Sequence, residues 1–268
     1  MANWFLLDDG AASGATNMAR DEFLLRLVMA GGGPPILRIY QFYPPAITIG
    51  YHQDPRKVLD MEAVGRDHLD LVRRFTGGRA LLHAGELTYC VIGPEGAGGF
   101  GSSLRGAYLA ISRAVVEGLR RIGVDARISA GYAGNREEGL ASPCLVSASR
   151  YEVTAGARKI VGSAQRRTGG NFLQHGSILL HAASGAIVEY LRGEWESLEE
   201  RITSVSREIG RDIRAGEVRY ALREAFAERF NVTFEPLELS EEMEEEIARR
   251  SREKAGEFAS LLGREVSC

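Results

Sequence analysis

Strand-like segments occur in runs along this chain, with few helices long enough to join parallel strands, and that pattern constrains the fold more than any other feature of the sequence. Three such segments, RYEVTAG, ARKIVGSAQRR and NFLQHGSILL, succeed one another between residues 150 and 180. The sequence TGGN between the last two is typical of a tight turn. Tight turns join antiparallel strands, whereas parallel strands need a long crossover connection. We therefore expect an α+β fold with a largely antiparallel sheet rather than a doubly wound parallel one.

Helical periodicity is clearest in two places. Residues 103–122 repeat apolar side chains at intervals of three and four, and Gly123 follows them. Residues 16–30 place Ala19, Phe23 and Leu27 on one stripe before the sequence GGGPP ends the helix. From residue 187 onward the chain is mainly helical and highly charged. We expect one domain over residues 1–268, with its core at about 4–190, a helical extension at 191–268, and any transition near 183–195.

Composition excludes several classes of protein. A net charge of −3 argues against a nucleic-acid partner. No apolar run approaches the roughly 18 residues of a membrane span, and the N-terminus lacks the basic start of a signal peptide. Cys90, Cys144 and Cys268 are odd in number and far apart, and the five histidines never fall at metal-ligand spacing. We expect a cytoplasmic protein without disulfides, bound metal or membrane contact.

The segment VRRFTGGRALLHAGELTY, residues 72–89, has two interpretations. In the first it is a β-hairpin with TGG at its tip and with Arg73 and Arg74 in solvent. In the second, Gly77 and Gly78 remove side chains from a loop so that its backbone N–H groups can approach a ligand between the two arginines. The pattern alone favours the hairpin.

Small residues interrupt the strand that begins near Lys159. Gly162, Ser163 and Ala164 are poor strand formers, and Gly176 and Ser177 repeat the feature on the next strand. Such a run leaves space beside a sheet for a narrow apolar slot or for close backbone contact. His83 and His175 flank these segments, and histidines in such places are more often structural than catalytic.

Cys144 and Lys159 are the residues with the most chemical promise. Cys144 follows a polar loop and the dipeptide Ser142–Pro143, which favours an accessible thiol over the buried, inert state that is commoner for cysteine. A reactive thiol needs a nearby cation to lower its pKa. Only three of the 33 basic residues are lysines, Lys57, Lys159 and Lys254, so the lysine at 159 is an unusual choice in this chain.

The order of five motifs resembles one known superfamily. These motifs are NMARDEFLLR, PPAITIGYHQ, VRRFTGGRALLHAGELTY, SPCLVSASRYEV and RKIVGSAQRRTGGNFLQHGSILL. Together they resemble the biotin/lipoate protein ligase and transferase superfamily. Within it, they are most similar to the cysteine-dependent octanoyltransferases that act on the glycine cleavage H protein. The similarity runs from about residue 4 to about residue 180, and more loosely beyond.

This resemblance implies a fold, a reaction and a set of site residues. The fold is a catalytic domain like that of class II aminoacyl-tRNA synthetases and biotin synthetases. The reaction moves octanoyl groups from acyl carrier protein to a lysine of a carrier protein such as glycine cleavage H protein or another lipoyl domain, and needs no cofactor. Cys144 is implied as the acyl-thioester nucleophile and Lys159 as the group that lowers its pKa. The residues expected to bind substrate are Arg73, Arg74, Gly77, Gly78, His83, Gly162, Ser163, Ala164, His175 and Gly176.

Three alternatives stay open. An ATP-dependent lipoate–protein ligase would share RRFTGG and KIVGSA, and would bring in ATP and Mg²⁺. Ligases are expected to have Asp after the motif histidine, whereas Ala84 follows His83 here. An amidotransferase between two carrier proteins would also use a cysteine. A non-enzymatic acyl-binding module would leave Cys144 unreactive. Leu145 departs from the aromatic residue that commonly follows the family's cysteine.

Overall fold

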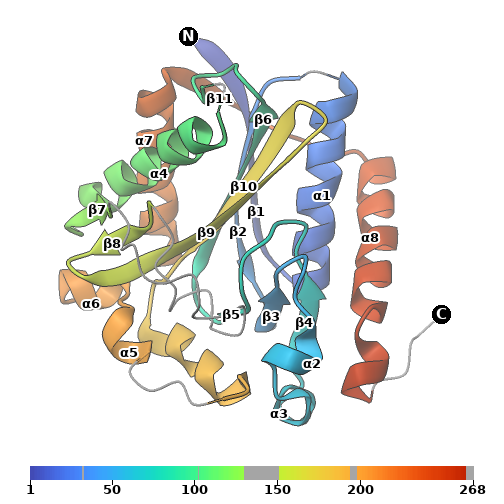
Figure 1. The fold of residues 1–268 in the computed structure, drawn as a ribbon. Helices are drawn as coiled ribbons and strands as arrows, with labels where there is room; N and C mark the ends of the chain where they lie inside the picture. The colour runs from blue at the N-terminus through green and yellow to red at the C-terminus, as the bar shows by residue number, and fades with distance from the viewer. Residues whose placement is uncertain (32, 102, 130–150, 194–197, 264–268) are drawn as a thin grey trace.

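The computed structural model describes residues 1–263 except residues 32, 102, 130–150 and 194–197. Cys144, Leu145 and the predicted polar loop at 129–143, apart from its first residue, lie outside the described residues. The described chain forms one large sheet with helices on both faces, and a smaller sheet below it (Figure 1).

The large sheet has eight strands in the order β11-β1-β2-β6-β10-β9-β8-β7. β1 pairs in parallel with β11 and β2, and every other neighbouring pair is antiparallel. The expected α+β class with a largely antiparallel sheet is therefore confirmed. The strands are β1 Ala2–Ala12, β2 Ile36–Phe42, β6 Leu87–Pro94, β7 Ala126–Ile128, β8 Val153–Ala155, β9 Arg158–Thr168, β10 Asn171–Ile178 and β11 Val232–Pro236.

The predicted hairpin between β9 and β10 is confirmed. Its turn has Gly169 and Gly170 at φ 54° and 74°, a conformation that side chains with a Cβ rarely adopt. The register pairs His175 with Ala164 and Gly176 with Ser163. The small residues of the two strands are thus brought side by side.

The smaller sheet overturns the hairpin predicted around TGG. Its order is β4-β3-β5, with β4 Asp70–Arg73, β3 Ala46–Ile49 and β5 Leu81–His83. β3 lies between the other two strands, parallel to β4 and antiparallel to β5. β4 and β5 therefore do not pair with each other, and residues 74–80 form a connection that crosses over β3. The prediction was wrong because the pattern of the segment does not show that a third strand separates the two.

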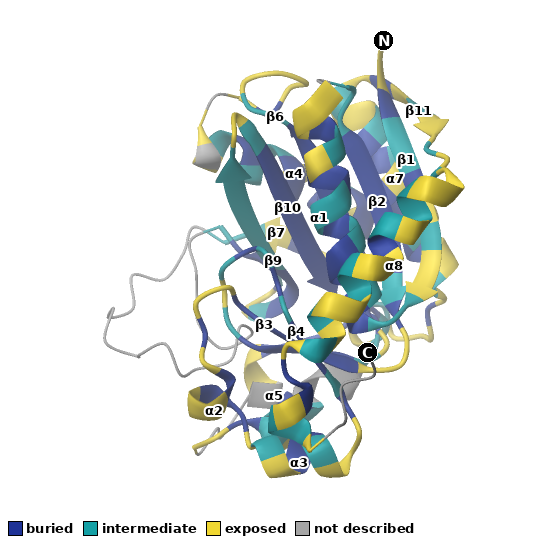
Figure 2. Cartoon of the chain, turned by 90° about the vertical axis from the view of Figure 1, so that its right-hand side faces the viewer, coloured by how far each residue is buried: buried dark blue, intermediate teal, exposed yellow. Residues whose placement is uncertain are grey.

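Two helices cover each face of the large sheet (Figures 1 and 2). α1 Gly14–Gly31 and α8 Glu241–Gly256 pack together on one face, and α4 Leu104–Arg121 and α7 Ala215–Phe230 on the other. The predicted helix at 16–30 is confirmed, and Ala19 of its predicted stripe is fully buried, but the centre of the buried face is shifted. Met18, Leu24 and Leu25 are buried, while Phe23 and Leu27 are only partly covered.

Short elements complete the lower part of the molecule. They are α2 Pro55–Val58, α3 Met61–Arg66, α5 Leu198–Arg201, α6 Val205–Ile209 and the 3-10 helices η1 Ala182–Tyr190 and η2 Ala259–Leu262. None of the helices in the described ranges is long and apolar enough to cross a membrane.

The C-terminal part contributes a strand that the sequence analysis missed. It is mainly helical as expected, yet β11 pairs with β1 in the large sheet, from Ala2 opposite Val232 to Leu6 opposite Pro236. The segment VTFEP is short and ends in proline, so its pattern alone does not distinguish a strand from a loop. The C-terminal part is thereby joined to the same sheet as the N-terminus through β11, which follows α7 directly.

Candidate active site

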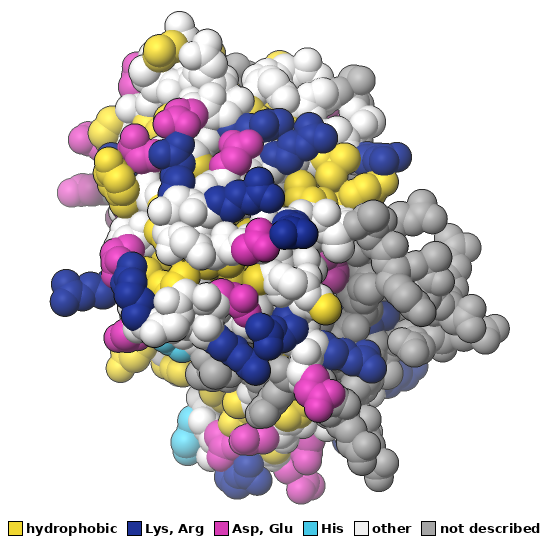
Figure 3. Space-filling model, turned by 90° about the vertical axis from the view of Figure 1, so that its left-hand side faces the viewer, with side chains coloured by type: hydrophobic (Ala, Val, Ile, Leu, Met, Phe, Trp, Pro, Cys, Tyr) yellow, Lys and Arg dark blue, Asp and Glu magenta, His cyan; other side chains and the backbone are white. Residues whose placement is uncertain are grey.

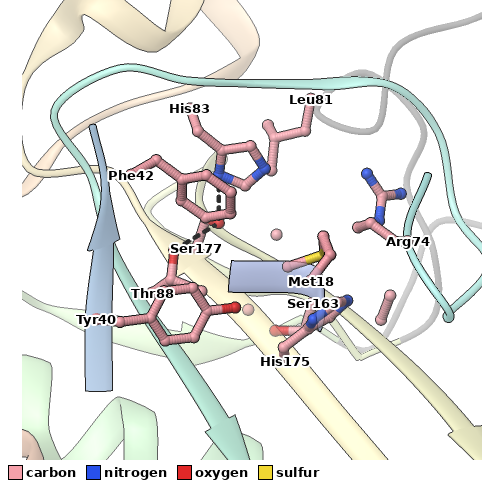
Figure 4. Close-up of a pocket in the computed structure, with 13 residues that line it drawn as sticks. Met18, Tyr40, Phe42, Arg74, Leu81, His83, Thr88, Ser163, His175 and Ser177 are labelled. Carbon is pink, nitrogen blue, oxygen red and sulfur yellow. Dashed lines mark hydrogen bonds between the residues drawn. The ribbon is translucent and has the colours of Figure 1, made fainter. Parts of the chain in front are cut away.

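A pocket opens beside the β9–β10 hairpin on the face of the sheet that carries α1 (Figure 4). The space between protein atoms there is about 330 Å³ with the open mouth included, but the cavity itself has a volume of only about 20 Å³. The pocket is therefore narrow. It is lined by Met18, Tyr40, Phe42, Arg74, Leu81, His83, Thr88, Gly162, Ser163, Ala164, His175, Gly176 and Ser177.

Seven of the predicted site residues meet at this pocket. They come from three separate parts of the sequence, and they are Arg74, His83, Gly162, Ser163, Ala164, His175 and Gly176. The absence of a side chain at Gly176 has a steric reason. A Cβ there would lie 2.5 Å from the Ser163 hydroxyl oxygen and 2.7 Å from the Tyr89 ring. Glycine thus leaves room for the 2.8 Å hydrogen bond between Tyr89 and Ser163.

His83 is buried and bound on both ring nitrogens. Nδ1 lies 2.7 Å from Glu86 Oε1, and Nε2 lies 2.8 Å from the Thr48 hydroxyl oxygen. The ring stacks on Phe42 with centroids 3.8 Å apart (Figure 4). Burial lowers the pKa of His83 below its usual value, against the opposing effect of Glu86. Near neutral pH the ring therefore carries one proton, which it donates from Nδ1 to the Glu86 carboxylate.

His175 has the same two kinds of partner. Nδ1 lies 3.1 Å from Asp21 Oδ2, and Nε2 lies 2.7 Å from the Thr76 hydroxyl oxygen. The pKa of Asp21 is lowered because Arg38 and His175 outweigh the opposing effect of burial. An ionised carboxylate only accepts hydrogen bonds, so the proton on His175 Nδ1 points at Asp21.

Arg38 anchors this second histidine from below. It is fully buried on β2, and its guanidinium donates to Asp21 at 2.6 Å and to Asp9 at 3.0 Å. Asn17 adds its side-chain oxygen at 2.7 Å, and the Tyr40 hydroxyl also donates to Asp21 at 2.9 Å. The NMARDEF motif therefore supplies two of the partners of this buried arginine, Asn17 and Asp21, while Asp9 comes from β1.

The hairpin interpretation expected Arg73 and Arg74 to lie in solvent, but Arg74 is buried and the Arg73 side chain is only 23% exposed. Arg74 is 5% exposed, and its guanidinium donates to the Thr48 carbonyl and hydroxyl oxygens and to the carbonyls of Gly77 and Arg79. Arg73 donates to the carbonyls of residues 50, 51 and 53 and to Glu257. Both arginines therefore organise backbone rather than extend into solvent.

Gly77 and Gly78 lie in the 74–79 loop but do not line the pocket. Gly78 has φ 95°, and a Cβ on Gly50 would overlap the Gly78 carbonyl oxygen. The close backbone approach expected of this loop is thus made to residue 50 of the same chain. Arg166 holds the loop from the other side, since its guanidinium donates to the Phe75 carbonyl at 2.9 Å and lies over the Phe75 ring.

Lys159 is buried, which excludes the interpretation of it as a surface residue. Its side chain is 6% exposed, and Nζ donates to Glu152 Oε1 at 2.6 Å. Its main chain also accepts a hydrogen bond from the Thr203 amide. Lys159 lies on β9 three residues before Gly162, at the end of the strand that continues into the pocket wall.

Arg166 and Arg167 do not form an unpaired basic patch on the surface, because each contacts other side chains. Arg167 pairs with Glu95 at 3.0 Å, and Arg166 stacks between Tyr51 and Phe75. On the face at the left of Figure 1, basic and acidic side chains are interspersed (Figure 3).

The thiol predicted to react, Cys144, lies outside the described residues, so its distance from Lys159 stays a prediction. Cys90 is fully buried in β6, and burial raises its thiol pKa well above the usual value. A buried thiol of raised pKa is a poor nucleophile, as expected for this cysteine.

Several residues around the pocket were missed by the sequence analysis: Asp21, Thr48, Thr76, Glu86 and Glu152. Two left a signal in the sequence. Glu86 follows His83 by three residues, and Asp21 is a charge three residues after Met18 and four before Leu25, on the buried face of α1. The partners of the other three are set only by strand pairing and loop packing.

The sequence of this chain is similar to those of known proteins over most of its length. Residues 13–227 match the family described as lipoyl protein ligase A/B catalytic domain. Octanoyltransferase LipM from Moorella thermoacetica is 39% identical over 246 residues, covering 89% of this chain and 90% of that protein. Octanoyltransferase LipM from Kyrpidia tusciae is 40% identical over 260 residues, covering 91% and 93%.

Solved structures share the fold over nearly the whole chain. Lipoate-protein ligase A, solved with bound ATP, superposes with a TM-score of 0.80 at 26% identity, covering 98% of this chain and 99% of that one. Ta0514 from T. acidophilum, solved with bound lipoic acid, gives 0.77 at 25% identity, covering 98% and 100%. The fold, the pocket and these matches together show that the chain belongs to the lipoyl protein ligase A/B catalytic domain family.

Proposed function

We propose that this octanoyltransferase of the lipoyl protein ligase A/B family moves an octanoyl group from octanoyl-acyl carrier protein to a lysine of a lipoyl-carrier protein, through a thioester on Cys144. Glycine cleavage H protein is the expected acceptor. Support comes from relatives named octanoyltransferases, which are 39% and 40% identical over about nine tenths of both lengths. Cys144 and Lys159 stand at the positions that the resemblance implies for the reaction.

The proposed reaction has two acyl transfers. In the first, the Cys144 thiolate attacks the thioester carbonyl of the donor, the new C–S bond forms, and the carrier's thiolate leaves and takes up a proton. In the second, the acceptor lysine, as a free amine, attacks the acyl-enzyme; an amide forms, the Cys144 thiolate leaves, and the amine's proton passes to solvent. The donor thioester is already activated, so the reaction needs neither ATP nor another cofactor.

The observation that carries this proposal is the buried ammonium of Lys159. Its Nζ lies 2.6 Å from Glu152 Oε1, and both side chains are less than a tenth exposed, at the end of the strand that forms the pocket wall. An ammonium 4 Å from a thiolate stabilises it by roughly 4 kcal/mol at an effective dielectric constant of 20. A compact ammonium on a flexible stem can serve first the thiolate and then the carbonyl oxygen, whereas a guanidinium is bulkier and favours planar partners.

The narrow pocket suits a slender acyl chain better than a broad ring. Burial of each methylene contributes about 0.8 kcal/mol. Gly162, Ser163, Ala164 and Gly176 keep one wall free of large side chains, and Phe42, Leu81 and Met18 supply apolar surface. These features support binding of the octanoyl tail here.

Mass spectrometry of the protein mixed with octanoyl-acyl carrier protein, without ATP, tests the proposal. The expected result is the gain of one octanoyl group, which is lost on adding glycine cleavage H protein. Cys144→Ala should abolish the adduct, and Lys159→Arg should slow its formation at least tenfold. A Cys144→Ala variant that still transfers octanoyl groups at the normal rate rules out the covalent route.

A ligase activity is the second candidate, because the fold superposes on a lipoate-protein ligase solved with ATP. A ligase would acylate the carrier from free acid only when ATP and Mg²⁺ are present, and would form no Cys144 adduct from the thioester donor. The same mass measurement with free octanoate and ATP therefore separates the two candidates.

A further inference from the structure

We propose that His83 and His175 are positioning residues that fix the 74–79 loop against the pocket, and that neither histidine removes the proton from the acceptor amine. The kinetic part of this inference rests on the proposed function, and the structural part does not. The inference starts from a repeated arrangement, in which each histidine lies between a carboxylate and a threonine hydroxyl at the pocket wall.

The direction of the hydrogen bonds follows from the chemistry of the partners. Each carboxylate occupies Nδ1 and accepts its proton, so in the neutral ring Nε2 is left as an acceptor. The only donor that a threonine side chain offers is its hydroxyl. Thr48 therefore donates to the neutral ring of His83 over 2.8 Å, and the Thr76 hydroxyl oxygen lies 2.7 Å from His175 Nε2, to which it would donate in the same way in a neutral ring.

Both chains of hydrogen bonds end in the 74–79 loop. Arg74 donates to the Thr48 hydroxyl oxygen at 2.6 Å, which leads from the loop through Thr48 to His83. Thr76 is itself a loop residue and contacts His175 directly. The side chains of Arg74 and Thr76, two residues apart in one loop, are thus each linked through a histidine to a buried carboxylate.

Other contacts hold the same loop from outside the pocket. The Tyr51 amide donates to the Thr76 carbonyl at 2.9 Å, and Arg166 donates to the Phe75 carbonyl. Both of these hydrogen bonds reach backbone oxygens, so they hold the main chain of the loop and do not set the side chains of Arg74 and Thr76. Tyr51 and Arg166 therefore hold the main chain of the loop from outside the pocket, and Thr48 and His175 hold two of its side chains from within.

A base role fits this geometry poorly. A general base must present a lone pair to the proton that it removes. Both ring nitrogens of each histidine are already engaged, Nε2 with a threonine hydroxyl and Nδ1 with a carboxylate. To act as a base, either histidine would have to release the loop.

Hydrogen–deuterium exchange of the peptide covering residues 74–80 tests the structural part. Thr76→Val removes the hydroxyl and keeps the shape, so exchange should rise about tenfold, while Thr76→Ser should stay close to wild type. Thr233→Val is the matched control, because Thr233 donates to Asn3 at the far edge of the sheet and is exposed. A Thr76→Val loop that exchanges within twofold of wild type overturns the inference.

Two substitutions of His175 separate positioning from base catalysis. Gln places its amide where Nε2 stands and can still meet Thr76, whereas Asn reaches only toward Asp21. Neither can act as a base near neutral pH. We expect His175→Gln to keep slow exchange and octanoyl-transfer kcat/KM within about fivefold of wild type, and His175→Asn to resemble Thr76→Val in both measurements.

The outcomes have distinct meanings. If His175→Gln loses more than a hundredfold in kcat together with one limb of the pH–rate profile, His175 is a base and the inference fails. If Gln and Asn loosen the loop equally, the Thr76 contact is not what holds it, and the inference also fails. If the wild-type protein transfers no octanoyl group, the proposed function fails while the exchange measurement still decides this inference.

Discussion

The two histidines of the pocket have matching partners but obtain them in different ways. His83 takes its carboxylate from Glu86, three residues along the same segment, and its ring rests on Phe42. His175 takes its carboxylate from Asp21, 154 residues away, and that carboxylate is bound by the buried Arg38. The first arrangement is assembled locally, and the second exists only when α1, β2 and β10 are packed together. The comparison teaches that equal hydrogen bonds at a pocket can depend on very different amounts of tertiary structure.

Neutralising the two carboxylates should give the largest contrast. Asp21→Asn leaves the fully buried Arg38 with one carboxylate fewer and should lower the free energy of unfolding by about 3–5 kcal/mol. Glu86→Gln replaces the charged acceptor of a neutral ring by an uncharged amide oxygen and should cost only about 1–2 kcal/mol. Urea unfolding of both variants measures the two losses in the free energy of unfolding. Equal costs would show that the Arg38 network does not distinguish the two histidines.

A methyl group at residue 176 should disturb the His175 strand. In Gly176→Ala the added Cβ would meet both the Ser163 hydroxyl and the Tyr89 ring, so the strand must shift. We expect a loss of about 1–3 kcal/mol in stability. Gly170→Ala is unsuitable as a control because its φ is positive; Gly216→Ala, where nothing lies within 4 Å, is the matched one. A Gly176→Ala protein as stable as Gly216→Ala would contradict the steric account.

The pH dependence of stability should separate the two sites. The pKa of His83 is lowered from 6.5, so below pH 6.5 the unfolded chain binds a proton that the folded chain does not, and stability falls as pH falls. The pKa of Asp21 is lowered from 3.8, so its contribution is complete above pH 3.8 and is lost as pH falls further. In His83→Gln the slope just below pH 6.5 should flatten, as chemical unfolding at pH 5.5, 6.5 and 7.5 would show. A slope unchanged from wild type would mean that His83 is not held neutral by the fold.

The stacking of Phe42 on His83 should have the smallest effect. Phe42→Leu keeps an apolar side chain but removes the ring, and a stacked pair contributes about 0.5–1.5 kcal/mol beyond its buried area. Among the described residues Phe42 stacks on His83, and no ring contact of His175 is found. Phe42→Leu should therefore leave hydrogen–deuterium exchange near Thr76 unaltered. Thermal unfolding measures the first effect, and a loss above 3 kcal/mol would indicate core collapse instead.

Sequence patterns predicted the parts of the fold that depend on neighbours in the chain. The TGGN turn, the helix ending at Gly123 and the small residues on β9 and β10 were all predicted, because turn chemistry and periodicity are local. The predicted TGG hairpin was wrong, and strand β11 was missed. Both errors concern which strands lie side by side, and pairing partners of short strands are decided by the packing of the whole sheet.

For the site, residue types in the motifs indicated that Lys159, His83 and His175 matter, and the motif order indicated the family. The sequence by itself thus determined the α+β class, the local turns and helix ends, and the placing of one of the three lysines beside a run of small residues. Only the tertiary structure decided that Glu152 meets Lys159, that Asp21 meets His175, and that Arg74 turns inward to Thr48. The physical reason is that a buried charge must find a partner wherever the fold brings one, and that partner need not be near in the chain.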